Sequence, residues 1–273
     1  MKQRLIVAGV GIPVLLLILL AAPVWATAAM CALLSAVGCY ELMHAVGKDE
    51  WKLLCLMPLF AAWMCTSIGL GEEWTPEPGL YMAAACFVAV VYTFAMADVT
   101  HGRERSLSFR TAMAGLFAMS AIAAGFACLV ILRDISPAVV LTPFIGAFMS
   151  DTGAFFAGRA FGKRKLCPAV SPNKTVAGCI GGFVGSIAGM AVFHLVVKTW
   201  FQLDLGWGVV ILMGVIGSLF GQLGDLSFSV IKREFGIKDY GAIFPGHGGV
   251  LDRFDSVLFV APAYLLFMLL YFA

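Results

Sequence analysis

Residues 229–256 read SVIKREFGIKDYGAIFPGHGGVLDRFDS and separate two long apolar runs near the C-terminus. They gather Lys, Arg, Asp, His and Gly residues in a chain that is 61% hydrophobic and only 12% charged. Soluble domains carry about 25% charged residues. The composition therefore predicts an integral membrane protein in which this stretch connects two membrane spans. The net charge of +2 gives no sign of a nucleic-acid partner.

The rest of the chain contains further candidate membrane spans. A helix crosses the hydrocarbon core with about 20 mostly apolar residues. Nine segments qualify: 5–24, 27–46, 53–71, 79–97, 111–132, 137–157, 176–197, 207–231 and 255–273. The sequence thus predicts an all-α, polytopic protein with a single membrane domain, residues 1–273. Residues 1–135 would form the N-terminal helices, and residues 136–273 would form the C-terminal helices with the two polar loops considered below.

The first segment allows two interpretations. MKQR, an apolar run and the small residues of VWATA resemble a signal peptide. However, the apolar run is longer than the h-region of about 7–15 residues that signal peptides contain. We therefore expect an uncleaved first helix.

The distribution of Lys and Arg predicts the orientation, because these residues are enriched in cytoplasmic loops. With the N-terminus in the cytoplasm, all but two of the 18 Lys and Arg residues fall on that side, and Arg133 and Lys198 fall outside. An odd number of spans then places the C-terminus outside. The polar loops 158–175 and 232–254 would both face the cytoplasm, where nucleotides are found.

Carboxylates within spans are costly and are therefore candidates for function. Asp225 lies late in the eighth span, and the spacing places Asp225, Ser229 and Lys232 on one helix face. Asp252 and Asp255 would share a face at the start of the ninth span. Because a hairpin joins these two spans, the sequence predicts that the two faces converge.

Opposed carboxylates surrounded by cations are suited to a divalent metal ion that binds phosphate oxygens. Mg²⁺ prefers one or two carboxylates together with substrate phosphates. Lys and Arg neutralise further phosphate charge, and backbone N–H groups of the glycine-rich PGHGG can reach the same oxygens. Alternatively, the loop is cytoplasmic and basic, and its carboxylates pair with neighbouring cations. That alternative explains neither Asp225 within a span nor the glycines.

The second polar loop, with the end of the span before it, reads SDTGAFFAGRAFGKRKLCPAVSPNKT, residues 150–175. Asp151 either contacts a ligand or pairs with Arg159 or another basic neighbour. SPNKT has turn chemistry and precedes a helix start near Thr175, where nucleotide phosphates could bind. Outside these loops, we expect Glu41 to be a buried polar partner of another helix, with contact to the site as the less favoured alternative. His194 is expected to form an interhelical hydrogen bond.

The polar connection also resembles a known family. Ser229, Lys232-Arg233, Lys238-Asp239, Gly241, Phe244-Pro245, His247-Gly248-Gly249, Asp252-Arg253 and Asp255 resemble the signature of the phosphatidate cytidylyltransferases, or CDP-diacylglycerol synthases. GDL at 224–226 and SPNKT occur in the order expected of that family. The resemblance implies that CTP and phosphatidate form CDP-diacylglycerol and pyrophosphate in phospholipid biosynthesis. It also implies Mg²⁺, with a second cation left open, a homodimer, and a bacterial inner membrane location with the active site facing the cytoplasm.

The resemblance further implies roles for individual residues. Asp225 and Asp252 would bind the metal and, with Lys232 and Arg253, form the catalytic set. The implied substrate-binding residues are Asp151, Ser171, Lys174, Ser229, Arg233, Lys238, Asp239, His247, Gly248, Gly249 and Asp255. A phosphatidate oxygen would attack the α-phosphorus of CTP directly.

Two other functions stay open on the sequence. A CTP-dependent lipid or polyprenol kinase would transfer the γ-phosphate and release CDP. A transporter or channel for an anionic metabolite would continue its polar residues toward the outer face, where the sequence offers few cations.

Overall fold

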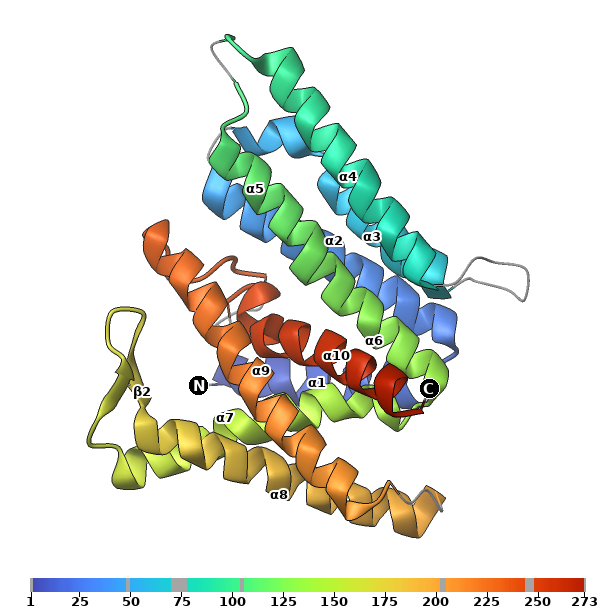
Figure 1. The fold of residues 1–273 in the computed structure, drawn as a ribbon, viewed down its shortest axis with the longest axis vertical. Helices are drawn as coiled ribbons and strands as arrows, with labels where there is room; N and C mark the ends of the chain where they lie inside the picture. Colours follow the sequence, from blue (N-terminus) through green and yellow to red (C-terminus); the bar gives the residue numbers. More distant parts are fainter. Residues whose placement is uncertain are drawn as a thin grey trace. The chain divides into compact units, whose positions relative to one another are not determined.

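The computed structural model describes residues 2–47, 50–69, 78–103, 106–201, 205–243 and 248–272. These residues are mostly helical (Figure 1). The elements, in chain order, are α1 (Lys2–Leu20), α2 (Val24–Gly47), η1 (Glu50–Leu54), α3 (Met57–Gly69), α4 (Pro78–Thr100), α5 (Phe109–Phe117), η2 (Ala118–Ala123), α6 (Ala124–Ile135), η3 (Val139–Leu141), α7 (Thr142–Phe161), β1 (Lys165–Cys167), β2 (Ser171–Thr175), α8 (Val176–Phe201), α9 (Trp207–Glu234) and α10 (Leu251–Phe272).

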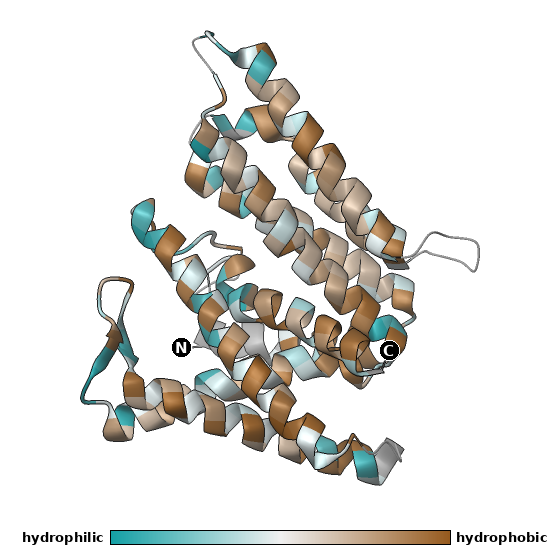
Figure 2. Cartoon of the chain, in the orientation of Figure 1, coloured by the Kyte–Doolittle hydropathy of each residue, from teal (hydrophilic) through white to brown (hydrophobic). Residues whose placement is uncertain are grey.

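The prediction of an all-α membrane protein is confirmed. Eight helical segments among the described residues are long and apolar enough to cross a membrane. A shorter apolar stretch, Gly11–Leu20, lies where the sequence predicts the first span. Figure 2 shows apolar residues along most of the helix lengths and hydrophilic residues on the β-hairpin. Many large apolar side chains are exposed, as lipid-facing positions require.

The chain divides into two compact units. The first consists of Met1–Pro137 with Phe235–Phe254, and the second of Ala138–Glu234 with Asp255–Ala273. The polar connection that follows α9, together with the first turn of α10, thus belongs to the first unit. The rest of α10 belongs to the second unit.

In the first unit, α2 packs against α3, α5, η2 and α6. The span Phe109–Ile135 contains a π-helical turn, η2. The Cys39 thiol donates to the Ala118 carbonyl oxygen at the start of this turn, with 3.6 Å between sulfur and oxygen. Arg133, which the sequence places in an outer loop, is instead buried at the end of α6. It donates to the Ala22 carbonyl oxygen just after α1, at 2.6 Å.

In the second unit, α7 and α8 lie side by side (Figure 1) and both contact α9. Their contact is made through glycines. A Cβ atom on Gly153 would overlap the Gly181 carbonyl oxygen, and one on Gly185 would overlap that of Met149. Small residues allow helix backbones to approach closely within a membrane, where packing drives association.

A β-hairpin joins α7 and α8, and the sequence analysis missed it. Strands β1 and β2 pair antiparallel, with Lys165 opposite Thr175. SPNKT therefore forms a strand, so its assignment as a turn is wrong, because antiparallel pairing overrides the poor strand propensity of Pro172 and Asn173. The predicted helix start is confirmed: the Thr175 hydroxyl oxygen accepts from the Gly178 N–H at 3.0 Å, as an N-cap does.

Candidate functional site

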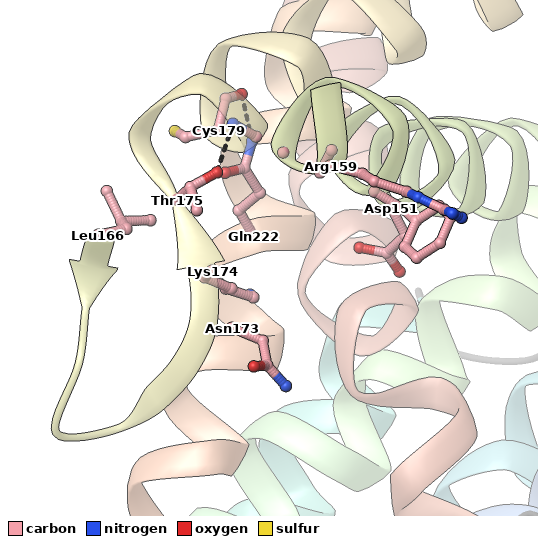
Figure 3. Close-up of a pocket in the computed structure, with 12 residues that line it drawn as sticks. Asp151, Arg159, Leu166, Asn173, Lys174, Thr175, Cys179 and Gln222 are labelled. Atoms are coloured by element: carbon pink, nitrogen blue, oxygen red, sulfur yellow. Dashed lines mark hydrogen bonds between the residues drawn. The ribbon is translucent and has the colours of Figure 1, made fainter. Parts of the chain in front are cut away.

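A cavity of about 450 Å³ lies in the second unit, among α7, the hairpin, α8 and α9 (Figure 3). Asp151 comes from α7 and Lys174 from β2, and both line the cavity. The complete lining consists of Asp151, Ala154, Phe155, Gly158, Arg159, Leu166, Asn173, Lys174, Thr175, Gly178, Cys179 and Gln222. The hairpin therefore brings a cation to a space bordered by membrane spans.

Asp225 binds side chains through both of its carboxylate oxygens. Oδ2 lies 2.5 Å from Lys174 Nζ, in an ion pair whose side chains are 24% (Lys174) and 29% (Asp225) exposed. The Ser229 hydroxyl donates to Oδ1 at 3.3 Å, as their shared helix face predicts. Because the Asp225 side chain remains partly exposed, a cation can compete with Lys174 for its carboxylate, whereas Lys174 Nζ itself is buried in this arrangement.

Further charges lie around this pair. Asp151 interacts electrostatically with Asp225 and Lys174. Asp255 interacts with Asp225, Lys232 and Asp151. Three carboxylates thus repel one another close to two ammonium groups, and additional positive charge would be favourable there.

The approach of α9 to α10 depends on a glycine. A Cβ atom on Gly224 would lie 2.6 Å from the Asp255 carbonyl oxygen, so any larger residue would push α10 away. This close approach brings Asp255 into electrostatic range of Asp225.

Gln222 lines the cavity and was missed by the sequence analysis. Its amide nitrogen donates to Ser218 Oγ at 2.8 Å and to the Cys179 carbonyl oxygen at 3.2 Å. Ser218 Oγ also lies 2.9 Å from Ser150 Oγ. A glutamine three residues before Asp225 in an apolar span was the available signal. This network joins α7, α8 and α9 next to the cavity.

Asp252 organises the polar connection of the first unit. Its Oδ2 accepts from the Tyr240 N–H at 2.8 Å and from the Gly249 N–H at 3.0 Å. Gly248 has φ +83°, and a Cβ atom there would lie 2.7 Å from the same oxygen. Only glycine adopts this conformation readily. Since α10 begins at Leu251, Asp252 and Asp255 are one helical turn apart.

The carboxylate of Glu41 also binds this connection. It accepts from the backbone N–H groups of Val250 and Leu251, both at 3.0 Å. The expectation that Glu41 is a buried partner of another helix is therefore confirmed. The sequence did not indicate which helix it would contact.

The other predicted site residues have different surroundings. Arg233 donates from Nε to the Val170 carbonyl oxygen at 3.1 Å and so holds the turn of the β-hairpin. Ser171 begins β2. Lys238, Asp239 and Arg253 are exposed, and Lys232 is half-buried. His247 lies outside the described residues, as do Phe244 and Pro245.

The carboxylates of the site can be compared with the ligands that the implied Mg²⁺ requires. Within the described ranges, no three His, Cys, Asp or Glu side chains form a group that could hold a metal ion. Mg²⁺ does not need such a cage, since one or two carboxylates and substrate phosphates are sufficient. Asp225 can supply one such carboxylate, because its side chain is partly exposed, and the ammonium of Lys174 already shows that a cation is bound there.

These features define a polytopic membrane protein with a cavity lined by charged residues of both signs, Asp151, Arg159 and Lys174. Residues 2–271 match the cytidylyltransferase family, so the chain belongs to this family and is a nucleotidyltransferase.

Curated relatives are phosphatidate cytidylyltransferases of staphylococci. The protein of Staphylococcus haemolyticus (strain JCSC1435) is 35% identical over 234 residues, which cover 84% of this chain and 85% of the relative. That of Staphylococcus aureus (strain COL) is 42% identical over 176 residues, 63% of this chain and 65% of the relative. That of Staphylococcus saprophyticus is 39% identical over 173 residues, with the same two coverages. These last two alignments span just under two thirds of each relative.

Proposed function

We propose that this chain is a phosphatidate cytidylyltransferase, which converts CTP and phosphatidate to CDP-diacylglycerol and pyrophosphate. The observation that carries the proposal is the Lys174–Asp225 ion pair beside a cavity among membrane spans, in a chain of the cytidylyltransferase family. The name of relatives that align with up to 84% of the chain supports phosphatidate as the lipid substrate.

The proposed metal ligands are Asp225 and Asp252. Bound Mg²⁺ would withdraw charge from phosphate oxygens and so favour attack at phosphorus. Lys174 now serves as the counter-ion of Asp225. With Asp225 holding a cation instead, the Lys174 ammonium would be free to bind the phosphates of CTP. A second cation is compatible with the additional carboxylates Asp151 and Asp255.

The proposed reaction is a direct displacement. An oxygen of the phosphatidate headgroup forms a bond to the α-phosphorus of CTP, and the bond from that phosphorus to the leaving pyrophosphate oxygen breaks. A phosphate monoester has a second pKa of about 6, so the attacking oxygen is largely ionised near neutral pH. The residues need to supply orientation and positive charge instead of a strong base. Lys232 and Arg253 are the proposed sources of that charge.

The remaining proposed substrate contacts are distributed over both loops. On the hairpin and the end of α7 they are Asp151, Ser171 and Lys174. On the C-terminal signature they are Ser229, Arg233, Lys238, Asp239, His247, Gly248, Gly249 and Asp255. The family resemblance supports these assignments. The cavity adds support for Asp151 and Lys174, which line it.

The proposal includes an active site at the cytoplasmic face of a bacterial inner membrane. The Lys and Arg distribution supports this orientation, and the relatives are bacterial. A membrane enzyme suits this pair of substrates, because the lipid tails stay in the bilayer while CTP stays in water. The homodimer that the resemblance implies belongs to the proposal too, and a mass measurement in detergent would test it.

The test is an assay of the purified full-length chain in detergent micelles with phosphatidate and CTP, with and without Mg²⁺. CTP labelled at the α-phosphate should label the lipid only when Mg²⁺ is present, and pyrophosphate should be released. Transfer of a γ-label with release of CDP would identify a lipid kinase instead. Uptake of unchanged solute into sealed vesicles, without lipid labelling, would identify a transporter.

A further inference from the structure

Glu41 on α2 has a buried carboxylate whose two oxygens both bind the start of α10. The residue is 3% exposed. Oε1 accepts from the Val250 N–H and Oε2 from the Leu251 N–H, both at 3.0 Å. The first N–H groups of a helix have no partner within the helix, and the helix dipole favours negative charge there. Glu41 therefore caps α10 from a helix more than 200 positions earlier in the chain.

Two glycines of the signature pack against the same carboxylate. A Cβ atom on either Gly241 or Gly249 would overlap Glu41 Oε1. Glu41 thus touches the connection on both sides of residues 244–247. Neither glycine could be enlarged without displacing the carboxylate or the loop.

Asp252 binds the connection at the residues that Glu41 contacts or directly next to them. It accepts from Tyr240, next to Gly241, and from Gly249. Gly249 therefore has the Asp252 carboxylate on its N–H and the Glu41 carboxylate against its Cα. The contacts of Glu41 and of Asp252 meet on the same backbone.

We infer that Glu41 is a positioning residue, which fixes the signature loop and the first turn of α10 so that Asp252 is held ready for its ligand. The role of Asp252 in this inference rests on the proposed function, whereas the anchoring of the loop rests on the contacts alone. Outer residues that orient a metal-binding group typically affect metal affinity or activity by about 10–100-fold. Glu41 would act in this way, without touching substrate.

Glu41→Gln is the sharpest test, because it keeps the shape of the side chain. One acceptor oxygen becomes an NH₂ group facing a backbone N–H donor, so one of the two bonds is lost. We expect faster hydrogen exchange in peptides covering 248–252, measured by mass spectrometry in detergent. We also expect a fall in kcat of about 10–100-fold and a rise of about 10-fold in the Mg²⁺ concentration for half-maximal activity. Glu41→Asp, which keeps both acceptors at shorter reach, should recover part of this loss.

Glu50→Gln is the matched control. Glu50 Oε2 accepts from the Ser108 N–H at 2.9 Å, and Ser108 is the N-cap of α5 in the same unit. This variant should speed exchange around residues 108–111 and leave both 248–252 and the Mg²⁺ dependence unchanged. The Glu41 variant should show the reverse pattern.

The outcomes separate the inference from the proposed function. If the wild-type chain makes CDP-diacylglycerol and Glu41→Gln only lowers Tm, with an unchanged Mg²⁺ curve, Glu41 has no positioning role. If the wild-type chain makes no product, the proposed function fails. The exchange measurement then decides alone: faster exchange at 248–252 supports the anchoring and unchanged exchange overturns it.

Discussion

The carboxylates Asp225 and Asp252 both belong to the predicted catalytic set, yet they are held in contrasting ways. Asp225 binds side chains, the Lys174 ammonium and the Ser229 hydroxyl, and remains 29% exposed. Asp252 binds backbone N–H groups of Tyr240 and Gly249, in a loop that the buried Glu41 also caps. Side-chain partners can exchange for a ligand at little structural cost, whereas lost backbone bonds change the loop itself. We therefore expect a ligand to replace a side-chain partner of Asp225, whereas Asp252 stays bound to the backbone of its loop.

The largest expected effect is that of removing either charge. Asp225→Asn and Asp252→Asn should each lower kcat by about 10²–10³-fold, as the loss of a preorganised charge-stabilising group does. If the comparison holds, only Asp252→Asn will also speed hydrogen exchange at residues 240–250. Equal exchange in the two variants, with activity lost in both, would show that their difference in partners has no structural consequence.

Lys174→Met tests the exchangeable partner of Asp225. Loss of the ammonium should raise KM for CTP by about 10-fold, since a charge-assisted bond to phosphate contributes about 1.5–3 kcal/mol. The control is Lys165→Met, an exposed lysine on the neighbouring strand of the same hairpin. Steady-state kinetics at varied CTP would measure both variants, and equal KM values in the two would remove Lys174 from the nucleotide site.

Gly248→Ala tests whether the loop conformation that holds Asp252 is needed for activity. The backbone has φ +83° and the added methyl group would meet Asp252 Oδ2. We expect a stability loss of about 1–3 kcal/mol from the backbone strain, together with reduced activity. Gly102→Ala is the matched control, because Gly102 has φ +75° and open space around it. Thermal unfolding should show similar losses for both variants, while only the Gly248 variant loses activity. Unchanged activity in that variant would argue against a functional link between this loop and Asp252.

Ser229→Ala should have the smallest effect. It removes one hydroxyl bond to Asp225 of 3.3 Å, of a kind that contributes about 1 kcal/mol. A fall of about 5-fold in kcat/KM is expected, with no change in loop exchange. A loss as large as that of Asp225→Asn would contradict so small a contribution of this hydroxyl.

Much of the fold could be predicted from local sequence. Hydropathy located the spans because each helix must satisfy its backbone within about 20 apolar residues. Helical spacing placed Ser229 beside Asp225 correctly, since that contact lies within one helix. The β-hairpin could not be predicted, because SPNKT is a poor strand sequence that becomes one only through pairing with β1.

The sequence by itself determined that the chain is a helical membrane protein, that carboxylates lie in its later spans, and that its motifs resemble those of a cytidylyltransferase. Tertiary structure alone decided that Lys174 pairs with Asp225, that Gln222 on α9 bonds to α8, and that Glu41 caps α10. Local pattern depends on the residues of one segment and can be read along the chain. These contacts join residues about 40 to 210 positions apart, and only the packing of helices against one another determines which of them meet.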